Sequence, residues 1–207
     1  MNIKDAKKAI KGKPMPKSLE KRFIENGMEN YLLGENGVYE RTAKLLEENK
    51  SANKALFIHL QQILPCIAFY EALLTKTNNK EEALKLYEAW AYNNLEKYSI
   101  AIKRIMKLGF YKKMPAFFDK TIDKLFGPDA GFESKKLPDL PVFSRDIIVC
   151  PYFETCKKYG CPEITQFFCK SDDLTYGNMH PKLIWNRTKT LGRGDDCCDF
   201  RLWLKED

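Results

Sequence analysis

The sequence is poor in histidine, the side chain that most often moves protons in enzymes, with only two among 207 residues. It also lacks the common catalytic and cofactor signatures: a Gly-x-Ser-x-Gly elbow, a phosphate-binding Walker loop, a dinucleotide-binding fingerprint and a His-Glu-x-x-His motif. We therefore expect no organic cofactor. Proton transfer is expected from carboxylates rather than from histidines.

Long apolar runs are also missing. The most apolar stretch, residues 55–74, is interrupted by five polar or helix-breaking residues: His59, Gln61, Gln62, Pro65 and Glu71. Such a stretch is typical of a buried core helix rather than of a membrane span. Residues 1–13 are rich in lysine, but the apolar segment of a secretory signal does not follow them. We therefore expect a cytoplasmic protein with reduced cysteines and no membrane partner.

The net charge of +7 does not indicate a nucleic-acid partner. Residues 1–140 hold 25 Lys and Arg against 18 Asp and Glu, whereas residues 141–207 hold 10 of each. No arginine stripe or interleaved aromatic motif accompanies this charge. We read it as a solvated basic surface.

The length and a composition of 44% hydrophobic and 30% charged residues fit a single folded domain, residues 1–207. Apolar residues three and four positions apart predict a helical layer over residues 1–130. Its expected helices are 18–34, 38–46, 53–74 (kinked at Pro65), 79–106 and 115–127. Ser18 and Asn79 are the expected N-caps, and Pro115 suits a first helical turn.

Residues 131–207 have a different pattern. We expect a proline-bearing loop over 135–141, a β-branched strand over 146–150 and a helix over 162–170. Two strands, 183–191 and 197–204, form a hairpin around the turn 192–196. Alternation places Cys198, Phe200, Leu202 and Leu204 on one face, opposite Cys197, Asp199, Arg201 and Trp203. The predicted fold is α+β, with a helical N-terminal two-thirds packed on a small antiparallel sheet.

Cysteines are concentrated in this second part. Cys66 is isolated in an apolar helix, whereas the other six lie in the last third of the chain: Cys150, Cys156, Cys161, Cys169, Cys197 and Cys198. In a reducing compartment such residues serve as thiols, metal ligands or catalysts more often than as disulfides.

Several motifs in this region form a recognisable set. They are Cys150-Pro151 after a strand, Gly160-x-Pro162-Glu163 before a helix, Cys169-x-x-Asp172, Arg187-Thr-x-Thr-Leu191, and the block from Gly194 to Arg201. Upstream, residues 64–73 and 81–84 match the same pattern. With these motifs the sequence resembles the L-2-amino-thiazoline-4-carboxylic acid hydrolases over about residues 52–203, with Cys198 rather than Cys197 as the family cysteine. Residues 1–50 match nothing known to us, and His180 matches mainly through the proline that follows it.

The resemblance implies that water opens a 2-aminothiazoline ring to give an N-carbamoyl-cysteine, a step of cysteine metabolism. Such a site needs a nucleophile or an activated water, a carboxylate near the amidine and a cation for the substrate carboxylate. Cys169 and Cys198 are the candidate nucleophiles, and Asp172 is the candidate general base or amidine clamp. The candidates for substrate binding are Arg187, Asp196, Asp199 and Arg201.

Each of these residues also has a structural interpretation. Cys198 can be a packing residue, Asp172 a cap, Asp196 a turn former and Arg187 an ion-paired strand residue. We nevertheless expect Cys169, Asp172 and Cys198 to converge on one pocket. Attack by a thiolate and attack by a carboxylate-assisted water both remain open.

Two other classes of function remain. A structural zinc site could use Cys150, Cys156, Cys161 and Cys169, although their gaps do not match paired Cys-x₂₋₄-Cys knuckles. A small-molecule-binding or sensor module that does no catalysis is the second, because the terminal block also resembles that of vinyl-reductase-type ligand-binding domains.

Overall fold

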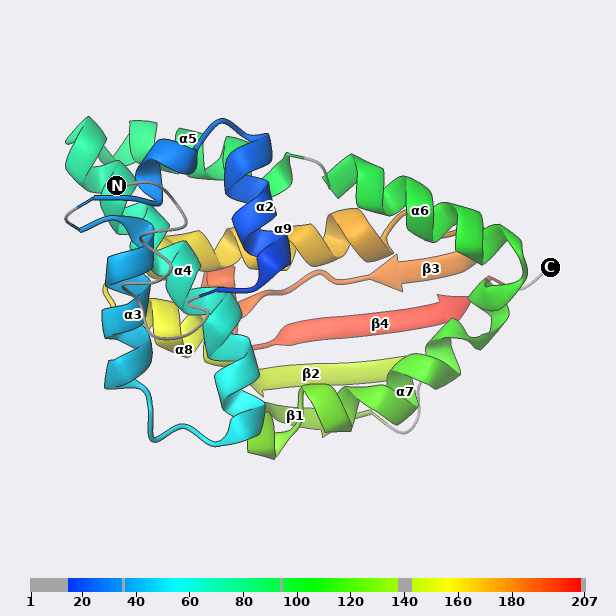
Figure 1. Ribbon diagram of the computed structural model, residues 1–207. Coiled ribbons are helices and arrows are strands. Elements are labelled where there is room, and N and C mark those ends of the chain that lie inside the picture. Colours follow the sequence, from blue (N-terminus) through cyan, green and yellow to red (C-terminus); the bar gives the residue numbers. More distant parts are fainter. Residues whose placement is uncertain (1–14, 35, 94, 138–142, 206–207) are drawn as a thin grey trace.

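The computed structural model describes residues 15–34, 36–93, 95–137 and 143–205 (Figure 1). The lysine-rich segment 1–13 and part of the expected loop 135–141 lie outside these residues. The longer helices are α2 (Lys17–Glu25), α3 (Val38–Glu48), α4 (Lys54–Thr77), α5 (Lys80–Tyr92), α6 (Leu95–Lys107), α7 (Met114–Leu125), α8 (Pro151–Lys158) and α9 (Thr165–Tyr176). Single 3₁₀ turns are η1 (Glu29–Tyr31), η2 (Phe110–Lys113), η3 (Pro128–Ala130), η4 (Pro162–Ile164) and η5 (Leu191–Arg193).

Helix α4 is the centre of the helical layer. The Asn53 side chain caps it by accepting the Leu56 N–H, and Asn78 ends it in the left-handed conformation. By length and composition α4 is apolar enough to cross a membrane, but 61% of its most apolar window is buried inside the protein. Its neighbours pack aromatic rings against it, since the rings of Phe23 and Trp90 both lie 4.8 Å from that of Phe69. This burial fits the predicted core helix.

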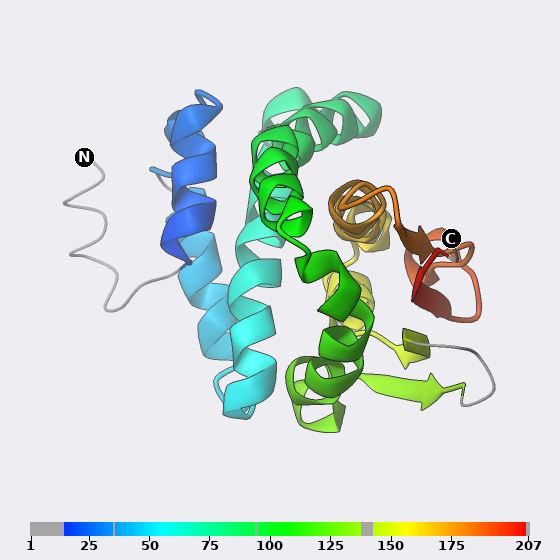
Figure 2. The same cartoon turned by 90° about the vertical axis from the view of Figure 1, so that its right-hand side faces the viewer.

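The sheet is antiparallel, with strand order β1-β2-β4-β3. Its strands are β1 (Glu133–Lys136), β2 (Phe143–Val149), β3 (Leu183–Asn186) and β4 (Cys198–Leu204). Figure 2 shows α2 and α4 on one side of the molecule and the strands on the other, and α7 contacts both β2 and β4. The α+β prediction, with helices in the N-terminal two-thirds and an antiparallel sheet near the C-terminus, is confirmed.

The C-terminal hairpin is confirmed in a shorter form. Strand β3 pairs with β4 from Leu183 opposite Leu204 to Asn186 opposite Arg201, and the chain then leaves the sheet. We had predicted strand as far as residue 191, but residues 187–190 are not strand. Arg187 pairs with α9, and the N–H groups of Thr188 and Lys189 donate to the Asp199 side chain rather than to a neighbouring strand. Alternation along β4 is as predicted: Cys198 and Leu202 are buried beneath the helices.

Several other local predictions were wrong. The predicted helix 18–34 ends at Glu25, and only the 3₁₀ turn η1 follows it. Strand β1 lies where a loop was expected, and it is exposed at all four positions, so it has no alternating apolar signal. Helix α8 was missed between the strand and the 162–170 helix. The predicted helix 79–106 is divided into α5, which ends at Tyr92, and α6, which begins at Leu95. At α2, Pro16 rather than Ser18 occupies the N-cap. By contrast, Asn79 caps α5 as expected, accepting the N–H groups of Glu81 and Glu82.

Candidate active site

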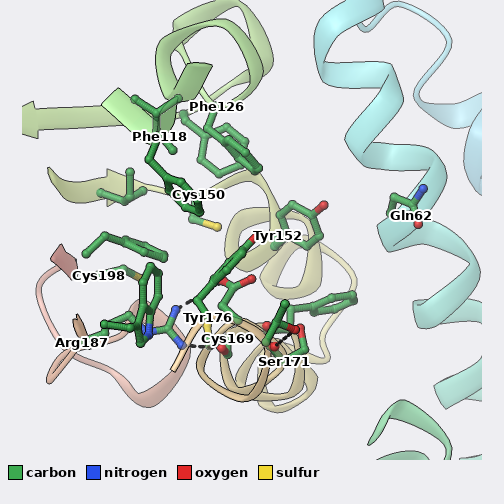
Figure 3. A pocket seen from close by; sticks show the side chains of 18 of the residues that line it. Gln62, Phe118, Phe126, Cys150, Tyr152, Cys169, Ser171, Tyr176, Arg187 and Cys198 are labelled. Carbon is green, nitrogen blue, oxygen red and sulfur yellow. Dashed lines mark hydrogen bonds and ion pairs between the residues drawn. The ribbon is translucent and has the colours of Figure 1, made fainter. Parts of the chain in front are cut away.

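A cavity of about 640 Å³ lies between the helices and the inner face of the sheet. Strands β2, β3 and β4 supply one wall, and α2 and α4 supply residues of the opposite wall. The N-terminus of α8 and helices α6, α7 and α9 enclose the remaining sides. Figure 3 shows the side chains that point into this space, including Cys150, Cys169, Arg187 and Cys198.

Helix α9 brings two of the predicted catalytic residues to the cavity. Cys169 and Asp172 are three positions apart, which places them on the same helical face, and both line the cavity. Cys198 reaches the same space from the start of β4, because the alternation of that strand turns it inward. The three side chains therefore line one cavity, as predicted.

The Cys198 sulfur is held by two hydrogen-bond donors. It accepts the backbone N–H of Leu191 at 3.3 Å and a hydrogen bond from the Cys169 thiol. The bond from Cys169 is the larger cause that holds the pKa of Cys198 below its ordinary value, against the opposing effect of burial. The same bond, together with burial, raises the pKa of Cys169. Within the pair, Cys198 is thus the thiol that loses its proton more readily, and Cys169 is the donor.

A glycine in the turn η5 allows this contact. A Cβ on Gly192 would lie 3.3 Å from the Cys169 sulfur and 3.1 Å from the Gln166 backbone nitrogen. These distances are tighter than ordinary Cβ contacts, so glycine lets the turn approach α9 more closely than a residue with a side chain would without a local shift. The approach places the Leu191 N–H at the Cys198 sulfur.

Arg187 is buried between α9 and the sheet, with only 1% of its side chain exposed. Its Nη2 pairs with Asp173 Oδ2 at 2.7 Å and also donates to the Cys169 carbonyl oxygen. Its Nη1 lies 3.5 Å from Asp172 Oδ2. The guanidinium also lies 5.0 Å from the centre of the Phe200 ring. Arg187 therefore lines the cavity, but its hydrogen bonds go to the protein itself.

Asp172 is the ionisable carboxylate of the cavity wall. Burial raises its pKa to about 7, the charge of Arg187 opposes this shift, and the charge of Asp173 adds to it. Its side chain still keeps 39% of its surface accessible, so small molecules in the cavity can reach it. Near neutral pH both protonation states are populated, which suits a group that gives and takes a proton.

Two further thiols, Cys66 and Cys150, line the cavity, and neither was among the predicted catalytic residues. Cys150 precedes α8 as its N-cap residue, and its side chain makes no capping hydrogen bond. Burial raises its pKa to about 12, so it is protonated at neutral pH. The Cys150-Pro151 pair at a strand end was the available signal, because proline favours the first turn of a helix.

The structure places the other proposed substrate-binding residues outside the cavity. Asp199 and Arg201 point to the opposite face of β4, where Arg201 pairs with Asp146 at 2.6 Å. Asp199 accepts the backbone N–H groups of Thr188 and Lys189. Asp196 is exposed and pairs with Lys189 at 2.9 Å. The alternation that brings Cys198 inward directs Asp199 and Arg201 away, so only Arg187 of this group lines the cavity.

His180 also lies outside the cavity lining. Its ring stacks on Tyr111, with centroids 3.7 Å apart, and its Nδ1 accepts the Lys182 backbone N–H at 3.1 Å. The other histidine, His59, is buried between Leu125 and Tyr152. Burial lowers the pKa of His59, which leaves it neutral at neutral pH.

The cysteines do not gather into the zinc site that we had kept as an alternative. Cys156 is hydrogen-bonded to Cys161 in the helical core, whereas Cys169 is hydrogen-bonded to Cys198 at the cavity, and both pairs are free thiols. In the described part of the chain, no group of three or more His, Cys, Asp or Glu side chains is placed to hold a metal ion. Cys156 and Cys161 are therefore buried packing residues.

We compared the chain with known proteins. Searches of curated proteins and of solved structures give no match. A family model, described as L-2-amino-thiazoline-4-carboxylic acid hydrolase, matches residues 57–202 and so includes the cavity's sheet, α9 and α4. This match supports a hydrolase-type assignment. The chain belongs to the L-2-amino-thiazoline-4-carboxylic acid hydrolase family.

Proposed function

We propose that the cavity hydrolyses an amidine-like ring of the 2-aminothiazoline-4-carboxylate type, with Cys198 as the nucleophile. The observation that carries this proposal is the Cys198 sulfur, which lines a cavity together with Asp172 while two donors stabilise its charge. The reacting carbon of such a ring is bonded to two nitrogens and one sulfur. Net addition of water breaks its bond to sulfur and gives an N-carbamoyl-cysteine.

The reaction divides into two steps. The Cys198 thiolate attacks the ring carbon, the carbon–sulfur bond of the ring breaks, and protonated Asp172 gives its proton to the departing sulfur. The carbamimidoyl group is then bound to Cys198. Asp172, now ionised, takes a proton from a water molecule, which attacks the same carbon and expels the Cys198 thiolate.

Two neighbours position these groups. Cys169 donates to the Cys198 sulfur, which lowers the pKa of Cys198 and favours its attacking thiolate form. Arg187 spans the two carboxylates of α9 and the Cys169 carbonyl, which fixes Asp172 against the cavity. We also propose a cytoplasmic location, where thiols stay reduced, a place in cysteine metabolism, and activity without a cofactor.

The experiment is to incubate the purified protein with L-2-amino-thiazoline-4-carboxylate and to measure the released thiol with a chromogenic disulfide. Cys198→Ser should lower the rate by several orders of magnitude, as loss of a nucleophile does. Cys197→Ser is the matched control, because this neighbour lies outside the cavity lining and should keep the wild-type rate. If Cys198→Ser stays active while Asp172→Asn is inactive, water is the nucleophile and our assignment is wrong. Absence of thiol release by the wild type would refute the proposed substrate.

A further inference from the structure

The cavity is much larger than the small ring of the proposed reaction. L-2-amino-thiazoline-4-carboxylate has about nine non-hydrogen atoms, which fill less than half of the cavity even at the ~30 Å³ that a liquid water molecule takes. A volume of about 640 Å³ is in the range of pockets that enclose drug-sized ligands. The remaining space needs an occupant.

The walls of this space are mainly apolar and rich in aromatic rings. Nine of the lining residues are aromatic, and they come from the sheet, α7, α8, α9 and the segment before β1: Phe118, Phe126, Phe132, Phe143, Tyr152, Phe168, Tyr176, Trp185 and Phe200. Such a lining favours alkyl or aryl carbon, because each Å² of apolar surface removed from water is stabilising by about 25 cal/mol. A small, charged ring alone would leave most of this surface unused.

The cationic groups of the lining are unequal. Both terminal nitrogens of Arg187 are engaged, by Asp173, the Cys169 carbonyl and Asp172, and its buried Nε is the donor left without a partner. A substrate carboxylate that binds through two oxygens would therefore have to displace a protein partner. Arg22 comes from α2 on the wall opposite the sheet. Its contacts are the Ala91 carbonyl at 3.4 Å and the face of Trp90, and among the described residues it has no carboxylate partner.

The reactive groups and the one lining arginine that has no carboxylate partner among the described residues therefore lie on opposite walls. Cys198 and Asp172 are at the sheet and α9, whereas Arg22 and Gln62 come from α2 and α4. Figure 3 shows Gln62 on a helix across the cavity from Cys198 and Arg187. Between the two walls lies the aromatic lining.

We propose that the natural substrate is an elongated amphiphile, with its reacting carbon at Cys198, an alkyl or aryl body against the aromatic lining, and an anionic group at Arg22. This inference deepens the proposed function and rests on it for the reacting end. The body and the anion are inferred independently of the reaction, from the volume, the lining and the charges.

The test uses 6-phenylhexanoate, which has an apolar body and a carboxylate but no scissile ring. Isothermal titration calorimetry should show one binding site in the wild type, and the compound should inhibit thiol release from the small ring competitively. Arg22→Gln should weaken binding roughly ten- to a hundred-fold, the usual effect of losing a hydrogen bond to a charged group. Arg104→Gln is the matched control, an exposed arginine of α6 outside the lining. It should bind like the wild type.

A second pair of variants tests the apolar body. Ile102→Trp fills the cavity from α6 and should weaken 6-phenylhexanoate at least ten-fold, whereas Ile105→Trp adds the same ring at a position that is 51% exposed. Equal binding to Arg22→Gln and wild type, or no binding at all, would overturn the inference. If ring opening persists in that case, the proposed function stands without it. If 6-phenylhexanoate binds as predicted but no ring is opened, the proposed function fails instead.

Discussion

Single side chains decide the chemistry of the cavity through the protons that they hold. The Cys198 thiol loses its proton more readily than an ordinary cysteine because Cys169 and the Leu191 N–H donate to its sulfur. Asp172 holds its proton more tightly than an ordinary aspartate because it is buried. The two shifts are opposite in direction and suit a nucleophile and an acid that act together near neutral pH.

The shift of Asp172 predicts how the stability depends on pH. Between its ordinary pKa of 3.8 and about 7, the folded protein keeps a proton that the unfolded chain has released, so this residue makes the protein less stable as pH rises. Asp172→Asn cannot bind this proton. The free energy of unfolding of the variant minus that of wild type should therefore increase between pH 5 and pH 8. Because the side chain is 39% accessible, solvent screening reduces the increase to about 1 kcal/mol.

Urea unfolding at several pH values measures this difference. Asp196→Asn serves as the control, because Lys189 lowers the pKa of that exposed carboxylate and its removal should give no such increase. An Asp172→Asn difference that stays constant or shrinks with pH would show that the folded pKa of Asp172 is not raised.

At the scale of elements, the turn η5 and helix α9 assemble the thiol pair. Local sequence rules predicted what each element does alone: the three-residue spacing put Cys169 and Asp172 on one helical face, and alternation turned Cys198 inward. The contact between the elements was not predictable, because it depends on how closely Gly192 approaches α9. Likewise, an ion pair was one interpretation of Arg187 from the sequence, but nothing local indicated Asp173 as its partner.

Gly192→Ala tests this contact. The added methyl group meets the Gln166 backbone and the Cys169 sulfur, so the turn must move away from α9 and take the Leu191 N–H with it. We expect a loss of roughly 1–3 kcal/mol in the free energy of unfolding, as for other overpacked contacts. We also expect slower alkylation of Cys198 by iodoacetamide, read by peptide mass mapping. Gly27→Asn is the control, because a Cβ there meets nothing within 4 Å and its φ of 65° lies in the left-handed region that asparagine adopts most readily after glycine. Unchanged alkylation in Gly192→Ala would contradict the role of the turn.

At the scale of the whole molecule, the cavity lies where the helical layer meets the sheet. The change of pattern near residue 130 predicted these two layers, because helix spacing and strand alternation are local properties. The empty volume between them could not be predicted, since it depends on how α2, α4 and α7 pack against the sheet. Cys150 shows the same limit: its motif was visible, but its place in the wall depends on the whole fold.

The shared cavity predicts that the two layers unfold together. Differential scanning calorimetry should show one transition, with equal calorimetric and van't Hoff enthalpies, as expected for the single domain 1–207. A ligand that contacts both walls should raise the midpoint temperature of that one transition. At a hundred times its Kd, 6-phenylhexanoate stabilises the folded state by about 2.7 kcal/mol. Two separate transitions, with only one moved by the ligand, would contradict this prediction.

The most direct test of the central claim is to trap the intermediate on Cys198. A slight excess of enzyme is mixed with L-2-amino-thiazoline-4-carboxylate, quenched in acid within the first turnover and digested for peptide mass mapping. Attack by Cys198 predicts that the peptide with this residue gains the mass of one substrate molecule, while the peptides with Cys169 and Cys150 do not. Turnover with Cys198 unmodified at every quench time, or with the added mass on another cysteine, would contradict the claim.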